Sequence, residues 1–150
     1  MIFDLHKLET VAHALEIRGV RYGWGAKANP LSYITLETVQ ELDCSGFAQL
    51  MTWYATGEII IPGTAWDQYH ELRGWALREH SGAMYHKACS NMGALLMCFI
   101  EPTSLHAGHV WYVHDGRTYE SHGGGGVSSR SWDTPILARE VSKILVMESR

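Results

Sequence analysis

Cys44 is the residue of this sequence whose surroundings most favour nucleophilic chemistry. It follows Asp43, and apolar residues at three- and four-residue steps then continue to a stop at Gly57. A thiol attacks as its thiolate, which the positive end of a helix dipole and unpaired backbone N–H groups stabilise. The same N–H groups, that of Ser45 among them, can bind the oxyanion formed at an attacked carbonyl. The sequence therefore predicts a helix that begins at Asp43 or Cys44 and supplies a nucleophile with an oxyanion hole.

A second group of reactive side chains flanks Asp115-Gly116. If these two residues form a type I′ turn, position 114 faces 117, 112 faces 119, 111 faces 120 and 109 faces 122. His109 then lies across from His122, and alternation places Glu120 on the same face. One imidazole with a second polar group to hold its ring is what a general base requires. The hairpin thus predicts a base, His109, with Glu120 and His122 as candidate partners.

The remaining cysteines and histidines favour simpler interpretations. We expect Cys89 and Cys98 to be small buried hydrophobes, because free cysteines are usually of that kind. An odd set of three cysteines without a CxxC pair argues against a disulfide framework and a cysteine-based zinc site. His106 together with His109 and His122 could imitate a zinc site of three imidazoles, which we keep as a minor alternative. It would leave Cys44 without a role, so we predict no metal and no other cofactor.

The elements that must position these residues run as helices first and strands second. We expect a helix over 5–18 capped by Asp4, the helix that starts at Cys44, and a short helix over 66–72 within an otherwise irregular stretch, 58–93. Strands are expected at 95–100, 109–113, 117–121, 136–138 and 144–147. This order predicts the α+β class, with N-terminal helices packed on an antiparallel sheet.

Length and composition set outer limits on the function. The chain has 150 residues, 46% of them hydrophobic, which suits a single domain over 1–150. Twelve Lys and Arg against sixteen Asp and Glu give a net charge of −4, which argues against nucleic acid or an anionic membrane as partner. The longest apolar run, 94–100, is far shorter than the roughly 18 residues of a spanning helix. The first residues lack the basic start and apolar run of a signal peptide, so we expect synthesis in the cytoplasm without an export signal.

Several motifs together resemble those of one known family. Asp43-Cys44-Ser45-Gly46-Phe47 and Gly108-His109-Val110 look like the nucleophile and base motifs of the NlpC/P60 family of papain-like cell-wall peptidases. Further segments fall in the family's order and extend the resemblance over most of residues 11–127: Tyr22-Gly23-Trp24-Gly25, Pro62-Gly63-Thr64 through Gln68, Gly93-Ala94-Leu95-Leu96, and Asp115-Gly116 through Glu120. The resemblance implies a papain-like fold.

The resemblance also implies roles for single residues. Cys44 corresponds to the nucleophile, His109 to the base, and Tyr22 to a group near the thiol that binds substrate or supports the oxyanion. For the third residue, alignment with the family favours Glu120, whereas direct opposition in the hairpin favours His122. The sequence departs from the family's pattern at three places: Ala94 replaces an Asp, Trp111 replaces a Gly, and an insertion over 30–42 precedes the nucleophile, where it could wall the cleft.

The function that the resemblance implies is hydrolysis of a stem-peptide or cross-link amide bond of bacterial peptidoglycan, with stem peptides as the partner. A bond beside γ-D-glutamyl is the family's commonest target, and other bonds stay open. Without an export signal or a wall-binding segment, we expect a phage-type lysin, a virion-associated enzyme or delivery by another machine. Two alternatives are kept, a papain-like acyltransferase or deamidase on a non-wall substrate and a non-catalytic wall-binding module. Nothing in the sequence indicates the oligomeric state.

Overall fold

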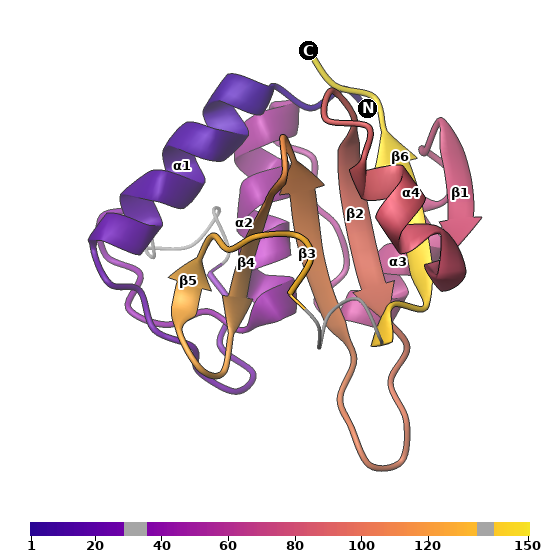
Figure 1. Ribbon diagram of the computed structural model, residues 1–150. Helices are drawn as coiled ribbons and strands as arrows, with labels where there is room; N and C mark the ends of the chain where they lie inside the picture. The colour runs from indigo at the N-terminus through magenta and orange to yellow at the C-terminus, as the bar shows by residue number, and fades with distance from the viewer. Residues whose placement is uncertain (29–35, 135–139) are drawn as a thin grey trace.

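The fold is a six-stranded antiparallel sheet with helices on both faces (Figure 1). The computed structural model describes residues 1–28, 36–134 and 140–150. The helices are α1 (Leu5–Ile17), α2 (Cys44–Thr56), α3 (Ala65–Leu72) and α4 (Tyr85–Cys89), with a 3₁₀ turn at Gly82–Met84. The strands are β1 (Arg78–Ser81), β2 (Leu95–Ile100), β3 (His109–His114), β4 (Arg117–His122), β5 (Gly126–Ser128) and β6 (Lys143–Met147). Their order in the sheet is β1-β6-β2-β3-β4-β5.

Local signals explain where the two long helices begin and end. Asp4 caps α1 by accepting a hydrogen bond from the Lys7 amide at 3.1 Å, and Asp43 caps α2 in the same way from the Gly46 amide at 2.6 Å. A carboxylate at this position satisfies a backbone N–H that has no partner within the helix. Gly57, with a φ of 77°, ends α2 in the left-handed conformation that glycine adopts without a steric cost. The start of α2 at Cys44 is therefore set by its flanking residues.

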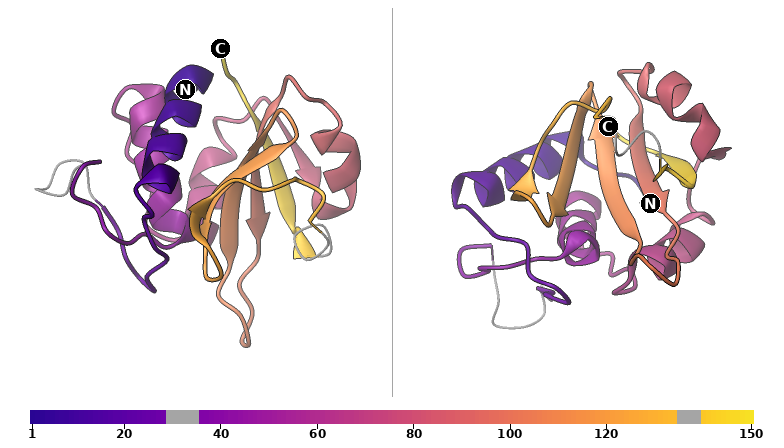
Figure 2. Two further views of the ribbon diagram at one scale, coloured as in Figure 1. Left: turned by 60° about the vertical axis from the view of Figure 1, so that its left-hand side comes forward. Right: turned by 60° about the horizontal axis from the view of Figure 1, so that its bottom comes forward.

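Two hydrophobic cores lie on opposite faces of the sheet, and β2 contributes to both (Figure 2). Leu95, Met97 and Phe99 pack under α1, α2 and α3, whereas Leu96 and Cys98 pack against α4. Because both faces of β2 are buried, the segment is a continuous apolar run in the sequence. Cys98 and Cys89 both lie in the α4-side core, as expected of small buried hydrophobes.

The β3–β4 hairpin has the predicted turn. Asp115 and Gly116 have φ angles of 50° and 76°, the positive values that a type I′ turn requires. The pairs His114↔Arg117, Val113↔Thr118 and Tyr112↔Tyr119 confirm the predicted register. The β3–β4 ladder ends at Tyr112↔Tyr119, and the other edge of β4 pairs with β5 from Glu120 to His122. The predicted pairing of 109 with 122 is thus not part of the ladder.

The α+β class and most predicted elements are confirmed. The helices expected at 5–18 and 66–72, the helix at Cys44, and the strands at 95–100, 109–113, 117–121 and 144–147 match the observed bounds to within one residue. The sequence missed β1, α4 and β5, which have three to five residues each and no apolar periodicity. The strand predicted at 136–138 lies outside the described residues.

Candidate active site

Cys44 is the first residue of α2, and it borders a cleft of about 430 Å³. The starts of α2 and β3 lie at the same end of the molecule (Figure 1). The side chain is 8% exposed, and its Sγ lies 3.9 Å from the carbonyl oxygen of Gly108, the residue before β3. The thiol therefore combines the start of a helix, where N–H groups have no helical partner, with direct access to a cleft.

Charged and polar groups brace the backbone around Cys44. Asp43 accepts hydrogen bonds from the Gly46 amide at 2.6 Å and the Ser45 hydroxyl at 3.3 Å, and it forms an ion pair with Lys27. Lys27 also donates to the Ser45 hydroxyl at 3.1 Å. Lys27 was missed by the sequence analysis, because a lone lysine in an irregular segment has no pattern that marks it.

Ser45 and Tyr22 lie where an oxyanion or a bound substrate can reach them. Both line the cleft with Cys44. The Ser45 carbonyl accepts a hydrogen bond at 2.9 Å from Gln68, whose other contact is the Pro62 carbonyl at 2.8 Å. Partial burial, followed by the negative charges of Cys44 and Asp43, raises the pKa of Tyr22. The Tyr22 hydroxyl therefore stays protonated and can donate a hydrogen bond beside the thiol.

Three tryptophans near the site, Trp24, Trp66 and Trp111, divide into two groups. Trp24 and Trp66 line the cleft, and Trp24 is 78% exposed. Trp111 is fully buried, and its ring stacks on that of His109 with centroids 5.3 Å apart and an interplanar angle of 26°. Trp111, a departure from the family's pattern, therefore supports one face of the His109 ring.

His109 connects the thiol to a buried carboxylate. Its Nε2 lies 3.1 Å from Oε1 of Glu120, and Cys44 is close enough to this ring to raise its pKa. Burial acts to lower the pKa of His109, but the hydrogen bonds and charges of Cys44 and Glu120 outweigh it and raise the pKa to about 9. The imidazolium form is therefore favoured at neutral pH.

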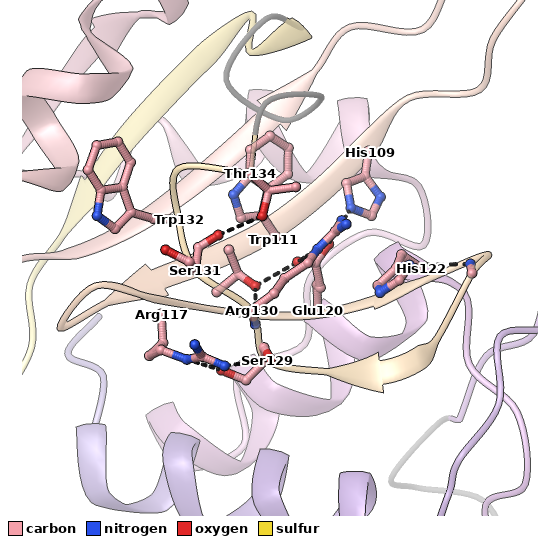
Figure 3. Close-up of polar contacts among 12 residues, drawn as sticks. His109, Trp111, Arg117, Glu120, His122, Ser129, Arg130, Ser131, Trp132 and Thr134 are labelled. Atoms are coloured by element: carbon pink, nitrogen blue, oxygen red, sulfur yellow. Dashed lines mark hydrogen bonds and ion pairs between the residues drawn. The ribbon is translucent and has the colours of Figure 1, made fainter.

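Glu120 is fully buried and has polar contacts on both oxygens (Figure 3). Arg130 donates to Oε2 through Nε and to Oε1 through Nη2, both at 2.9 Å, and the Thr118 hydroxyl donates to Oε2 at 2.7 Å. Burial acts to raise the pKa of Glu120, but the hydrogen bonds from His109, Arg130 and Thr118 outweigh it and lower the pKa to about 2. Glu120 is therefore ionised beside His109.

His122 has a different environment. Its Nδ1 accepts a hydrogen bond from the Gly124 amide at 3.2 Å, and Figure 3 shows its ring apart from that of His109. No hydrogen bond joins the two imidazoles within the described part of the chain. Burial, and after it the charge of Arg130, lowers the pKa of His122. Of the two candidate partners, the structure brings Glu120 to His109.

Other expectations at the site concern metals, membranes and the insertion. In ranges 1–28, 36–134 and 140–150, no three His, Cys, Asp or Glu side chains are grouped so that they could hold a metal ion. No helix in these ranges is long and apolar enough to cross a membrane. Of the insertion over 30–42, residues 30–35 lie outside the description, and 36–42 are not among the residues that line the cleft.

Comparison with known proteins identifies the fold. No protein-family description and no curated protein matches the chain. It is similar to an NLP/P60 family lipoprotein-like protein of Staphylococcus aureus subsp. aureus Mu50, with a TM-score of 0.58 and 19% identity over 99% of this chain and 44% of that one. The P60 domain of a Mycobacterium avium subspecies paratuberculosis antigen gives a TM-score of 0.55 and 22% identity over 95% and 94% of the two chains.

A third solved structure agrees with these two. An NlpC/P60 family protein of Bacillus cereus gives a TM-score of 0.56 and 21% identity over 89% of this chain and 39% of that one. The chain thus spans less than half the length of the first and third proteins and nearly all of the second. Its fold is that of NlpC/P60 proteins, as the sequence motifs predicted.

Proposed function

We propose that this NlpC/P60-fold chain is a cysteine hydrolase that cleaves a stem-peptide or cross-link amide bond of bacterial peptidoglycan. The observation that carries the proposal is that Cys44, at a helix start on the border of a cleft, lies against the residue before His109, whose ring contacts the buried carboxylate of Glu120. A thiol, an imidazole and a group that orients the imidazole are the parts of nucleophilic acyl chemistry. The solved structures of the same fold, all from NlpC/P60 proteins of bacteria, support a cell-wall-related hydrolase.

The first half of the reaction forms an acyl-enzyme. The Cys44 thiolate, with its proton held on the His109 imidazolium, attacks the carbonyl carbon of the substrate amide. The electron pair of the carbonyl π bond moves to oxygen, which would accept hydrogen bonds from the Ser45 amide and the Tyr22 hydroxyl, two residues that line the cleft. When the carbonyl re-forms, the C–N bond breaks and His109 delivers its proton to the departing amine. A thioester to Cys44 remains.

The second half returns the enzyme to its starting state. His109, now neutral, takes a proton from water while the water oxygen attacks the thioester carbon. Collapse of this second tetrahedral adduct breaks the C–S bond and releases the thiolate beside the His109 imidazolium. Glu120 keeps its charge throughout, because its pKa of about 2 lies far below neutral pH. Its role is to hold the ring and stabilise the imidazolium.

The cleft suits a peptide that has both polar and apolar groups. Its walls include the aromatic side chains of Tyr22, Trp24 and Trp66 beside the ammonium of Lys27. Such a lining can pack against methyl groups of alanyl residues while it donates hydrogen bonds to carbonyl or carboxylate oxygens. Delivery to the wall by a phage or another machine stays a prediction from the sequence.

The test is digestion of purified peptidoglycan followed by mass spectrometry of the released muropeptides. Wild type and Cys89→Ala should give the same new fragments, because Cys89 is buried in the α4-side core. Cys44→Ala should give none, because the nucleophile is absent. Fragments from Cys44→Ala would overturn the mechanism, and the mass of the wild-type fragments identifies the bond.

An absence of fragments from every variant would overturn the proposed substrate. Alkylation of Cys44 by iodoacetamide then separates the two alternatives. Fast, pH-dependent alkylation would point to an acyltransferase or deamidase acting on another substrate, whereas a rate like that of free cysteine would point to a binding module.

A further inference from the structure

Arg130 lies at the active site, but the proposed reaction gives it no direct role. It lies beyond β5, and the backbone ties it to β4: the Thr118 amide donates to the Arg130 carbonyl at 2.8 Å, and the Arg130 amide donates to the Thr118 hydroxyl at 3.1 Å. Its guanidinium then lies along the Glu120 carboxylate and donates to both oxygens at 2.9 Å (Figure 3). This two-point contact fixes the plane as well as the position of the carboxylate.

The hydrogen bonds of Glu120 leave its carboxylate one orientation. Oε1 accepts from His109 at 3.1 Å and Arg130 at 2.9 Å, and Oε2 accepts from Arg130 at 2.9 Å and Thr118 at 2.7 Å. Four partners fill the acceptor capacity of a carboxylate. A rotation that moved Oε1 away from His109 would break the guanidinium contact at the same time. Arg130 also offsets the charge of a side chain that is fully buried.

We infer that Arg130 is a positioning residue of the active site, which acts through Glu120 to hold the His109 ring beside Cys44. The inference rests on the proposed roles of Cys44 and His109 and adds a fourth residue to their series. It also explains why Glu120, and not His122, meets His109, because the fork of Arg130 holds Glu120 there.

Arg117 provides a matched control for a merely structural role. Like Arg130, it joins β4 to the segment after β5, since it donates to the Ser129 carbonyl at 2.8 Å and the Ser129 hydroxyl at 3.2 Å. Figure 3 shows its guanidinium on Ser129, apart from Glu120. Loss of either arginine removes contacts between the same two segments. Of these two arginines, Arg130 alone contacts the Glu120 carboxylate in the part of the chain that the structure describes.

The experiment measures the rate of Cys44 alkylation by iodoacetamide from pH 4 to 10, in a Cys89→Ala background. Arg130→Met should lower the rate at pH 7 by about tenfold or more and shift its pH dependence, because a misplaced ring no longer pairs with the thiolate. Arg117→Met should match the parent protein. Arg130→Lys, which keeps the charge but not the fork, should recover part of the rate.

A double variant distinguishes loss of positioning from simple unfolding. Glu120→Gln with Arg130→Met leaves no uncompensated charge in the site, and it should alkylate at the rate of Glu120→Gln alone, since Arg130 acts only through Glu120. Additive losses, or an Arg130→Met protein with the parent's rate and pH profile, would overturn the inference. The readout needs no substrate, so the inference stands if the rates follow this pattern while peptidoglycan stays intact, a result that would overturn only the proposed function.

Discussion

The start of α2 and the β3–β4 hairpin hold the two reacting side chains by different means. At α2, Cys44 is presented by the helix itself, and its capping residue Asp43 bonds to residues within three positions and to Lys27. At the hairpin, His109 is held by Glu120, eleven residues further along the chain, and Glu120 is held by Arg130, ten residues beyond it. The helix backbone therefore positions Cys44, whereas charged side chains position His109.

The two regions also differ in their contact with solvent. The two cations are equally exposed, since the Lys27 and Arg130 side chains are both 31% exposed, but the Asp43 side chain is 11% exposed and that of Glu120 is fully buried. An ionised group as buried as Glu120 is tolerated only because it is fully paired. Substitutions that unpair Glu120 should therefore cost more than substitutions of comparable size around Cys44.

The largest effect is expected at His109. His109→Ala should lower kcat/KM for release of muropeptides by about 10³-fold, because general acid–base catalysis is lost from both half-reactions. The measurement is initial-rate chromatography of soluble fragments. His106→Ala, an exposed neighbour on the preceding loop, should stay within about twofold. Similar losses in both variants would show that the loop matters more than the ring.

The next largest effect is expected for Glu120, and it should exceed the effect of a matched substitution at His122. Glu120→Gln keeps the shape of the side chain but removes the charge that stabilises the imidazolium, so kcat/KM should fall by about 10²-fold. His122→Gln should change it by less than about threefold, because His122 bonds to the backbone of Gly124 instead of His109. The same assay applies to both. The reverse order would make His122 the orienting residue and break the contrast between the two regions.

Stability should show the same contrast. Arg130→Met leaves the buried Glu120 without its guanidinium partner and should lower the free energy of unfolding by about 3 kcal/mol. Lys27→Met leaves a carboxylate that is still engaged as a helix cap, and it should cost less than about 1 kcal/mol. Urea unfolding at pH 7, followed by tryptophan fluorescence, measures both values. Equal costs would show that burial does not distinguish the two ion pairs.

Stability should also depend on pH in a way that Glu120 explains. Its pKa falls from 4.5 to about 2 on folding, so its contribution is complete above 4.5 and is lost as pH falls toward 2. The pKa of His109 rises from 6.5 to about 9, so its contribution is complete below 6.5 and is lost as pH rises through 9. The unfolding free energy should therefore be highest near pH 4.5–6.5.

A matched variant shows which residues cause the loss of stability on the acid side and on the alkaline side of this optimum, the acid and alkaline limbs. In Glu120→Gln the acid loss should shrink by about 3 kcal/mol, and the alkaline loss should shrink too, because His109 has lost a charged partner. Urea unfolding at half-unit steps from pH 2.5 to 10 would measure both limbs. An acid limb unchanged from wild type would show that other carboxylates produce it.

The same contrast explains which parts of the site could be predicted. The helix start at Cys44 was predicted correctly because the signals that set it, Asp43 before and Gly57 after, are local in the sequence. The hairpin register was predicted because Asp115-Gly116 permits one tight turn. Long-range contacts are different, since no spacing rule connects Lys27 to Asp43 or Arg130 to Glu120.

The choice between Glu120 and His122 depended on where the β3–β4 ladder ends. The hairpin rule extends the register to His122 opposite His109, but the ladder stops at Tyr112↔Tyr119. The His122 ring accepts a hydrogen bond from Gly124, in the glycine loop that leads to β5. Glu120 is held by Arg130, a contact that no spacing rule predicts. The sequence therefore predicted the elements that carry Cys44 and His109 but left the partner of His109 open.

The smallest effect is expected for Asp43→Asn, and it tests the α2 region by itself. Asparagine caps helices as well as aspartate does, so the bond to the Gly46 amide persists while the ion pair with Lys27 is lost. We expect a cost below about 1 kcal/mol in urea unfolding and a change in Cys44 alkylation of less than about threefold. Asp43→Ala, which loses the cap as well, should cost about 1 kcal/mol more. If Asp43→Asn slowed alkylation as much as Glu120→Gln, charge and not backbone direction would control the thiol, and the two regions would work by the same means.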